Sequence, residues 1–180
     1  SETVRGFLDA GYYVIGIDRI EKRVDADGYK HYVVDLGDKG SMQRILEENT
    51  VHRIVHMAAL AHTTGGIKYT WDDYMHYNVE CAKNVFELAG SIPVLFISTV
   101  DVYGFTMETV GEQMVPHPVS DYAKSKVMAE EECKKLSHYT IYRFSPVYTE
   151  TVKRDIQKRY YLKYPNFAYQ IGKGQEYEVL

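Results

Sequence analysis

A tyrosine and a lysine four residues apart carry the clearest chemical signal in this sequence. Tyr122 and Lys126 stand at the start of an expected helix, so both side chains project from the same helix face. A phenol titrates near ~10 in water, and an adjacent ammonium favours the phenolate and brings its pKa toward neutral pH. The pair is therefore suited to proton removal by general base catalysis.

The spacing alone is a weak signal, because the chain has 17 tyrosines and coincidental pairs occur on any solvated helix face. A hydroxyl residue upstream strengthens it. Thr99 follows the apolar run Val94–Ile97, which predicts a buried strand. A hydroxyl at the carboxyl end of a strand can bind the substrate oxygen whose proton Tyr122 removes, and so hold it in line. The alternative is a buried threonine that merely completes its strand.

Alternating strand and helix patterns position these residues. Such alternation predicts a parallel sheet with crossover helices, in which ligands bind along the carboxyl ends of the strands. We expect the longest helix at 71–89, with Gly90 as its C-terminal stop, and the Tyr122 helix at 121–136. The other expected elements are a helix at 3–11, a helix around Met42–Leu46, and strands at 12–18, 32–34, 53–57 and 139–142.

Composition sets broad limits on partners and location. The 180 residues suit one ordinary domain, and the net charge of -4 gives no basic excess that would attract nucleic acid. No apolar run approaches the ~18 residues of a membrane helix, so we expect a cytoplasmic protein without membrane contact. Cys81 and Cys133 have no CxxC partner, and we expect neither a metal site nor a disulfide.

Together these segments resemble the extended short-chain dehydrogenases/reductases, of the NAD-dependent sugar-nucleotide epimerase/dehydratase kind. In that family a strand ending in Ser-Ser/Thr precedes Val-Tyr-Gly and then, some two dozen residues later, a Tyr-x-x-x-Lys helix. Here Thr99, Val102-Tyr103-Gly104, Tyr122 and Lys126 match. The resemblance implies Tyr122 as general base, Lys126 as the group that lowers its pKa and holds the ribose, and Thr99 as the group that orients the sugar hydroxyl.

The same resemblance implies a fold and a domain organisation. We expect an α/β protein with a Rossmann-like doubly wound parallel sheet over residues 1–150, binding NAD, and the start of a smaller C-terminal substrate-binding part over 151–180. The expected substrate is a nucleotide-linked sugar. Members of the family resemble one another in forming dimers through their two long helices, here 71–89 and 121–136, so a homodimer is also implied.

Further positions match the cofactor contacts of the family. Asp18 matches the acid that accepts hydrogen bonds from the adenosine ribose and favours NAD over NADP, although Arg19 beside it is a contrary sign. Asn78 matches a buried asparagine that braces strand ends, and His56 is expected to be a satisfied core histidine. The remaining cofactor contacts that the resemblance implies are Asp35 and Leu36 near the adenine, Ala58 and Ala59 near the diphosphate, Tyr122 and Lys126, and Pro146 near the nicotinamide.

Two departures from the family leave alternatives open. The Gly-x-x-Gly-x-x-Gly turn is absent, and we interpret the chain as a fragment that lacks the first strand and this turn. A non-catalytic dinucleotide-binding or structural protein of the same fold is therefore one alternative. A sugar-nucleotide dehydratase is another, but dehydratases resemble one another in having Thr-Asp-Glu where this chain has Thr99-Val100-Asp101. Valine cannot protonate a leaving hydroxyl, so epimerisation or simple oxidoreduction is favoured.

Overall fold

The structure is a computed structural model that describes residues 2–21, 26–61, 68–106 and 109–147. The chain divides into two units, Ser1–Arg143 and Phe144–Leu180. The first unit contains the elements that position the predicted site. The expected C-terminal part at 151–180 lies outside the described residues.

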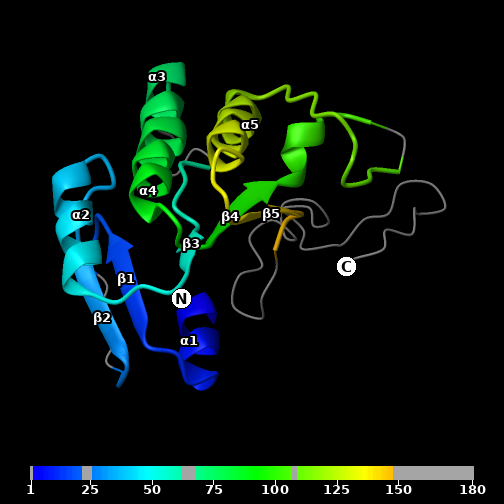
Figure 1. Ribbon diagram of the computed structural model, residues 1–180. Helices are drawn as coiled ribbons and strands as arrows, with labels where there is room; N and C mark the ends of the chain where they lie inside the picture. The colour runs from blue at the N-terminus through cyan, green and yellow to red at the C-terminus, as the bar shows by residue number, and fades with distance from the viewer. Residues whose placement is uncertain (1, 22–25, 62–67, 107–108, 148–180) are drawn as a thin grey trace, which may run out of the picture. The chain divides into compact units, whose positions relative to one another are not determined.

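From β2 onward strands and helices alternate along the first unit, as the sequence pattern predicts, whereas β1 is followed directly by β2 in the described order (Figure 1). The elements are α1 (Glu2–Asp9), β1 (Val14–Asp18), β2 (Tyr29–Val33), α2 (Lys39–Glu48), β3 (Ile54–His56), α3 (Trp71–Tyr74), the π-helical turn η1 (Met75–Glu80), α4 (Cys81–Ala89), β4 (Val94–Thr99), the 3-10 turn η2 (Val100–Tyr103), α5 (Asp121–Cys133) and β5 (Tyr139–Phe144).

The strands form two sheets with parallel pairing. β1 pairs in parallel with β2, and β3 pairs in parallel with β4, beside which β5 lies. Within the described residues no hydrogen bonds join β1 to β3, so the parallel sheet, which the sequence predicts without its first strand, is present as two pieces. Parallel pairing nevertheless brings neighbouring carboxyl ends to a common edge, so Asp18 stands directly beside Val33 in the register of the two-stranded sheet.

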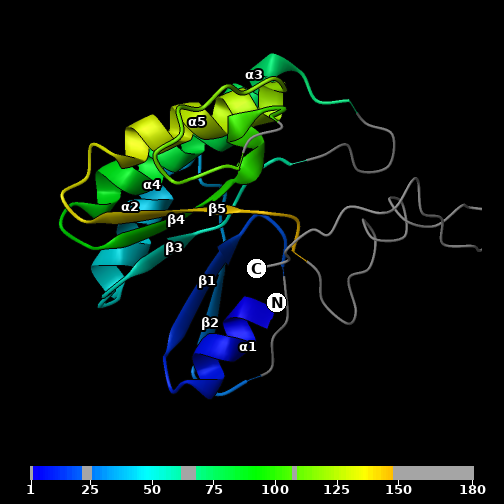
Figure 2. The ribbon, with the colours of Figure 1, turned by 90° about the vertical axis from the view of Figure 1, so that its right-hand side faces the viewer.

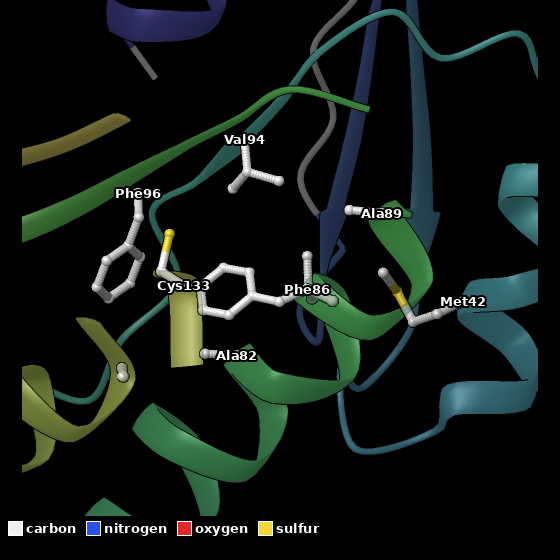
Figure 3. Packing of buried hydrophobic residues seen from close by; sticks show 9 residues of the cluster. Met42, Ala82, Phe86, Ala89, Val94, Phe96 and Cys133 are labelled. Atoms are coloured by element: carbon white, nitrogen blue, oxygen red, sulfur yellow. The ribbon is translucent and has the colours of Figure 1, made fainter. Parts of the chain in front are cut away.

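The helices α4 and α5 pack side by side on one face of the three-stranded sheet (Figure 2). The core lies between these helices, α2 and β4, with the Phe86 ring near its centre (Figure 3). Edge-to-face contacts join Phe86 to the rings of His56 and Phe96, each at 5.5 Å between centroids. The buried residues of this core are Met42, Ala82, Val85, Phe86, Ala89, Val94, Phe96, Ala129 and Cys133.

The long segment 71–89 is helical throughout but is not one regular α-helix. A capping box between Thr70 and Asp73 begins it, and Gly90, with φ of 55°, ends it as expected. Between α3 and α4 the chain widens into the π-helical turn η1, where the amide of Cys81 bonds to the carbonyl of His76. Such turns insert an extra residue and re-aim side chains, and this one contributes the buried Asn78.

Candidate functional site

Thr99 and Tyr122 meet at the carboxyl end of β4. Thr99 is the last residue of β4, and its Oγ1 accepts a hydrogen bond of 3.2 Å from the amide of Asp101 at the start of η2. Ser120 caps α5 by accepting a 3.1 Å hydrogen bond from the amide of Ala123, which places Tyr122 in the first helical turn. The Thr99 hydroxyl is close enough to the Tyr122 phenol to oppose the rise in its pKa that burial causes. The tertiary structure thus brings together the two hydroxyl groups that the sequence predicts to cooperate.

The environment of Tyr122 favours its protonated form. Burial raises the pKa of the phenol, the negative charge of Asp101 and the neighbouring Tyr74 raise it further, and the hydrogen bond with Thr99 acts in the opposite direction. The Tyr74 ring lies 6.4 Å from that of Tyr122 between centroids. Neither Asp101 nor Tyr74 was among the predicted site residues, although the comparison with the Thr-Asp-Glu of dehydratases places Asp101 where those enzymes have glutamate.

Lys126 lies one helical turn further along α5 and is almost completely buried. Its Nζ donates a hydrogen bond of 2.7 Å to the carbonyl of Ile97 and lies 4.0 Å from the centre of the Phe96 ring. Burial lowers the pKa of the ammonium to about 8, and the carboxylate of Glu130 opposes that change. Lys126 therefore changes charge close to neutral pH, unlike an exposed lysine.

Asn78 connects the loop after β3 to the helix that carries Tyr122. Its Oδ1 accepts from the amide of Leu60 at 2.6 Å, and its Nδ2 donates to the carbonyl of Leu60 at 3.0 Å and to Oγ of Ser125 at 2.9 Å. Ser125 in turn donates a 2.7 Å hydrogen bond to the carbonyl of Tyr122. The expected bracing role of Asn78 thus has a definite geometry.

The residues predicted for the adenosine end follow β1 and β2 at their shared edge. The Asp18 carboxylate accepts a 3.2 Å hydrogen bond from the amide of Ile20, and the Arg19 guanidinium stacks on the Tyr77 ring at 4.4 Å. Asp35 accepts a 2.8 Å hydrogen bond from the amide of Gly37. The carbonyl of Leu36 accepts a 3.2 Å hydrogen bond from Asn84 on α4.

The remaining predicted cofactor residues are exposed. Ala58 and Ala59 follow β3, and their small side chains let another molecule approach the backbone closely. A half-buried carboxylate at Asp18, this open stretch and the buried ammonium of Lys126 suit a dinucleotide with a ribose at each end. Pro146 belongs to the second unit, and its predicted contact stays a prediction.

His56 is a core residue, as expected, but the expectation that both of its ring nitrogens have hydrogen-bond partners is wrong for one of them. The ring is 4% exposed and stacks on Phe96, and its Nε2 has no hydrogen-bond partner among the described residues. Burial, with a smaller effect of the Lys126 charge, lowers the pKa of this imidazole to about 3. His56 is therefore neutral and packed between rings. Within the described ranges, no group of three acidic, histidine or cysteine side chains could hold a metal ion.

Sequence reasoning missed a buried ion pair behind the site. Glu130 and Arg143 are joined by two hydrogen bonds, of 3.0 Å and 2.6 Å. The signal was available, because Glu130 follows Lys126 by four residues and shares its helix face. Among the described helices, none combines the length and apolar character needed to cross a membrane.

Comparison with known proteins supports the arrangement of strands and helices. Residues 1–180 match the model of the NAD-dependent epimerase/dehydratase family. The chain belongs to this family. A UDP-glucuronate 4-epimerase from Thermodesulfobacterium geofontis (strain OPF15) is 24% identical over 140 residues, which cover 68% of this chain and 43% of that protein.

Solved structures show the same fold at low sequence identity. The UDP-glucuronic acid 4-epimerase from Bacillus cereus, in complex with UDP-glucuronic acid and NAD, aligns with a TM-score of 0.70 and 21% identity, covering 82% of this chain and 53% of that one. UDP-glucose 4-epimerase from Thermotoga maritima, with UDP-glucose, aligns with a TM-score of 0.70 and 23% identity, covering 82% of this chain and 52% of that one. The Bordetella bronchiseptica enzyme WbmG, in complex with NAD, aligns with a TM-score of 0.69 and 20% identity, covering 78% of this chain and 47% of that one. The chain spans about half the length of these relatives.

Proposed function

We propose that the whole protein is an NAD-dependent enzyme that oxidises and, by returning hydride to the opposite face, epimerises a nucleotide-linked sugar. The observation that carries this proposal is the meeting of the Tyr122 and Thr99 side chains at the end of β4, with Lys126 buried one turn further along. Family membership supports it, since the family is defined by NAD-dependent epimerases and dehydratases.

Each of these side chains has a distinct role in the proposed reaction. NAD, when bound, supplies the hydride acceptor. The Thr99 hydroxyl binds the sugar hydroxyl and orients it toward Tyr122. Tyr122 takes the proton onto its phenolate oxygen. In this structure the Tyr122 pKa responds to burial, Asp101, Tyr74 and Thr99, and the proposed role of the Lys126 ammonium is to favour the phenolate once cofactor and substrate are bound. Asp18, with Asp35 at the same sheet edge, holds the adenosine end.

The proposed substrate is a UDP-linked hexose or hexuronic acid, because the similar structures are complexes with UDP-glucose or UDP-glucuronic acid. Dehydration stays the weaker alternative. Val100 cannot donate a proton, and the one carboxylate near Tyr122 at this turn is the exposed Asp101. A non-catalytic protein would have no need for a buried lysine beside a paired tyrosine and threonine. Dimer formation through the two long helices and a cytoplasmic location stay predictions.

The test is Tyr122→Phe in the full-length protein. This change removes one oxygen and keeps the ring, so unfolding temperature and NAD affinity should hardly change. We expect kcat for epimerisation of UDP-glucose or UDP-glucuronic acid to fall by at least about a hundredfold. Thr99→Ala should mainly lower kcat, and Lys126→Met should also weaken NAD binding.

The matched control is Tyr139→Phe, which removes the same oxygen from an exposed tyrosine on β5 and should leave kcat unchanged. A Tyr122→Phe enzyme that keeps most of its activity would show that another group removes the proton. The three assignments would then be withdrawn together.

A further inference from the structure

Glu130 is a completely buried carboxylate directly behind the proposed site. Its Oε1 accepts hydrogen bonds from Oγ of Ser98 at 2.5 Å and from Nε of Arg143 at 3.0 Å, and its Oε2 accepts from the second guanidinium arm at 2.6 Å. The Glu130 side chain is 0% exposed and that of Arg143 is 16% exposed. Both carboxylate oxygens therefore have donors, and the Arg143 guanidinium forms a two-bonded ion pair with them.

The ion pair reaches the elements that carry the site. Ser98 precedes Thr99 on β4, so the Glu130 carboxylate holds the strand end one residue from the predicted hydroxyl. At the other end of the pair, the Arg143 guanidinium donates a 2.7 Å hydrogen bond to the hydroxyl of Tyr103 on η2 and stacks on its ring. Residues on β4, η2, α5 and β5 are therefore fixed to one buried charge.

Glu130 also follows Lys126 by one helical turn, and both side chains are buried. Glu130 is the buried acidic side chain near this part of α5 among the described residues. His56 is buried but neutral, and Asp101 is acidic but exposed. The elements packed against α5 carry the titratable residues Asp72, Asp73 and Tyr74 on α3, His76, Tyr77 and Glu80 on η1, Cys81, Lys83 and Glu87 on α4, and Asp101 and Tyr103 on η2. The helix α5 itself carries Asp121, Tyr122, Lys124, Lys126, Glu130, Glu131, Glu132 and Cys133, and Arg143 on β5 reaches Glu130.

We propose that Glu130 is a positioning residue whose buried negative charge keeps the Lys126 ammonium protonated while its hydrogen bond to Ser98 holds the end of β4 in place. The inference rests on the proposed function of Tyr122 and Lys126. The working state of that pair carries a phenolate and an ammonium together. An anion one turn from the lysine stabilises this arrangement over the uncharged phenol and amine.

The physical reason lies in the cost of burying the lysine. Burial lowers the Lys126 pKa to about 8, and Glu130 is the charge that opposes the effect of burial. Without Glu130 the amine would lose its proton at lower pH, and the ammonium needed beside the phenolate would be present over a narrower pH range. Removing an anion lowers the pKa of a neighbouring cation, so loss of the Glu130 charge should lower the Lys126 pKa.

The experiment uses Glu130→Gln in the full-length, NAD-bound protein. Glutamine keeps the size and one acceptor oxygen but removes the charge. We expect the basic limb of the kcat/KM profile to move to lower pH by at least about one unit, with a lower maximum. In 13C-lysine-labelled protein, the Lys126 resonance, assigned by its loss in Lys126→Met, should titrate lower by a similar amount. This resonance reports the lysine directly and does not depend on turnover.

Two further variants separate charge from packing. Glu131→Gln makes the same change at the next residue, on an exposed side chain that pairs with Lys134 at 2.6 Å, and should move neither readout. Glu130→Asp keeps the charge with a shorter reach, so it should lower kcat but preserve the pH limb and the lysine titration.

If Glu130→Gln does not fold, the double variant Glu130→Gln, Arg143→Gln replaces both buried charges and leaves neither uncompensated. A smaller shift in the same direction is expected there, because loss of the Arg143 cation offsets part of the loss of the anion. An unchanged Lys126 titration in either folded variant overturns the inference, and so does failure of both variants to fold, which would make Glu130 purely structural. Loss of activity in Tyr122→Phe combined with an unchanged Lys126 titration refutes the role of Glu130 alone, whereas an active Tyr122→Phe refutes the proposed function.

Discussion

Asn78 donates a hydrogen bond of 2.9 Å to Oγ of Ser125, a residue 47 positions later in the chain. The same amide group pairs with both backbone groups of Leu60. One buried side chain on the π-helical turn thus connects the loop after β3 to the first turns of α5. Because Ser125 also bonds to the carbonyl of Tyr122, this connection helps to fix where the proposed base stands.

Replacing Asn78 by alanine should destabilise the protein by about 2–4 kcal/mol, since it leaves the N–H and C=O of Leu60 without these partners in a part-buried setting. Urea denaturation measures the change. Asn84→Ala is the matched control, because its hydrogen bonds to the carbonyls of Leu36 and Gly37 are longer, at 3.2 Å and 3.5 Å. It should cost less than about 1 kcal/mol, and equal losses in the two variants would contradict the bracing role.

The cofactor preference should depend on Asp18. A carboxylate at this strand end repels a 2′-phosphate, so the full-length protein should bind NAD more tightly than NADP. Asp18→Asn should reduce this preference by about tenfold or more, as measured by calorimetry with both dinucleotides. Asp27→Asn removes a carboxylate before β2, at the opposite end of the parallel pair, and should leave the preference intact. Comparable binding of NAD and NADP by the unmodified protein would refute the assignment.

The buried imidazole of His56 should make the fold sensitive to acid. Its pKa of about 3 lies below the unfolded value of ~6.5, so between these values the unfolded chain binds a proton that the folded chain does not. The free energy of unfolding should therefore fall by about 1.4 kcal/mol per pH unit on acidification from pH 5.5 to pH 4 through this group.

His56→Met should remove that part of the slope in denaturation curves recorded across this pH range. His138→Met removes one histidine at an exposed position and serves as the control, in which the slope of the unfolding free energy against pH should stay the same. An identical slope in His56→Met and the unmodified protein would show that His56 is already charged, or already exposed, in the folded state.

Gly104 should tolerate no side chain. Its φ is 70°, and a Cβ there would lie 2.2 Å from the backbone oxygen of His117. That segment cannot withdraw easily, because the amide of His117 bonds to the carbonyl of Val102 at 2.9 Å. Gly104→Ala should cost about 2–4 kcal/mol, measured by thermal or urea unfolding, through strain and overlap together. Gly111→Ala meets nothing within 4 Å and should be nearly neutral.

Local chemistry determined much of this protein before any tertiary contact was considered. Apolar runs fixed β1 and β4, the hydroxyl of Ser120 began α5, and Gly90 ended the long helix, because capping and periodicity depend on residues close in sequence. The spacing of Tyr122 and Lys126 likewise followed from helix geometry alone. Family membership could be inferred from these same motifs, and comparison with known proteins confirmed it.

Only the tertiary structure decided how these groups behave. The phenol of Tyr122 titrates above its ordinary pKa because burial and Asp101 act on it, and the pairing of Glu130 with Arg143 depends on the packing of α5 against β4 and β5. The π-helical turn η1 was likewise not predicted, because the apolar spacing of 71–89 fits a regular helix equally well. Burial and long-range pairing set the energies of charged groups, and a sequence pattern shows neither of them.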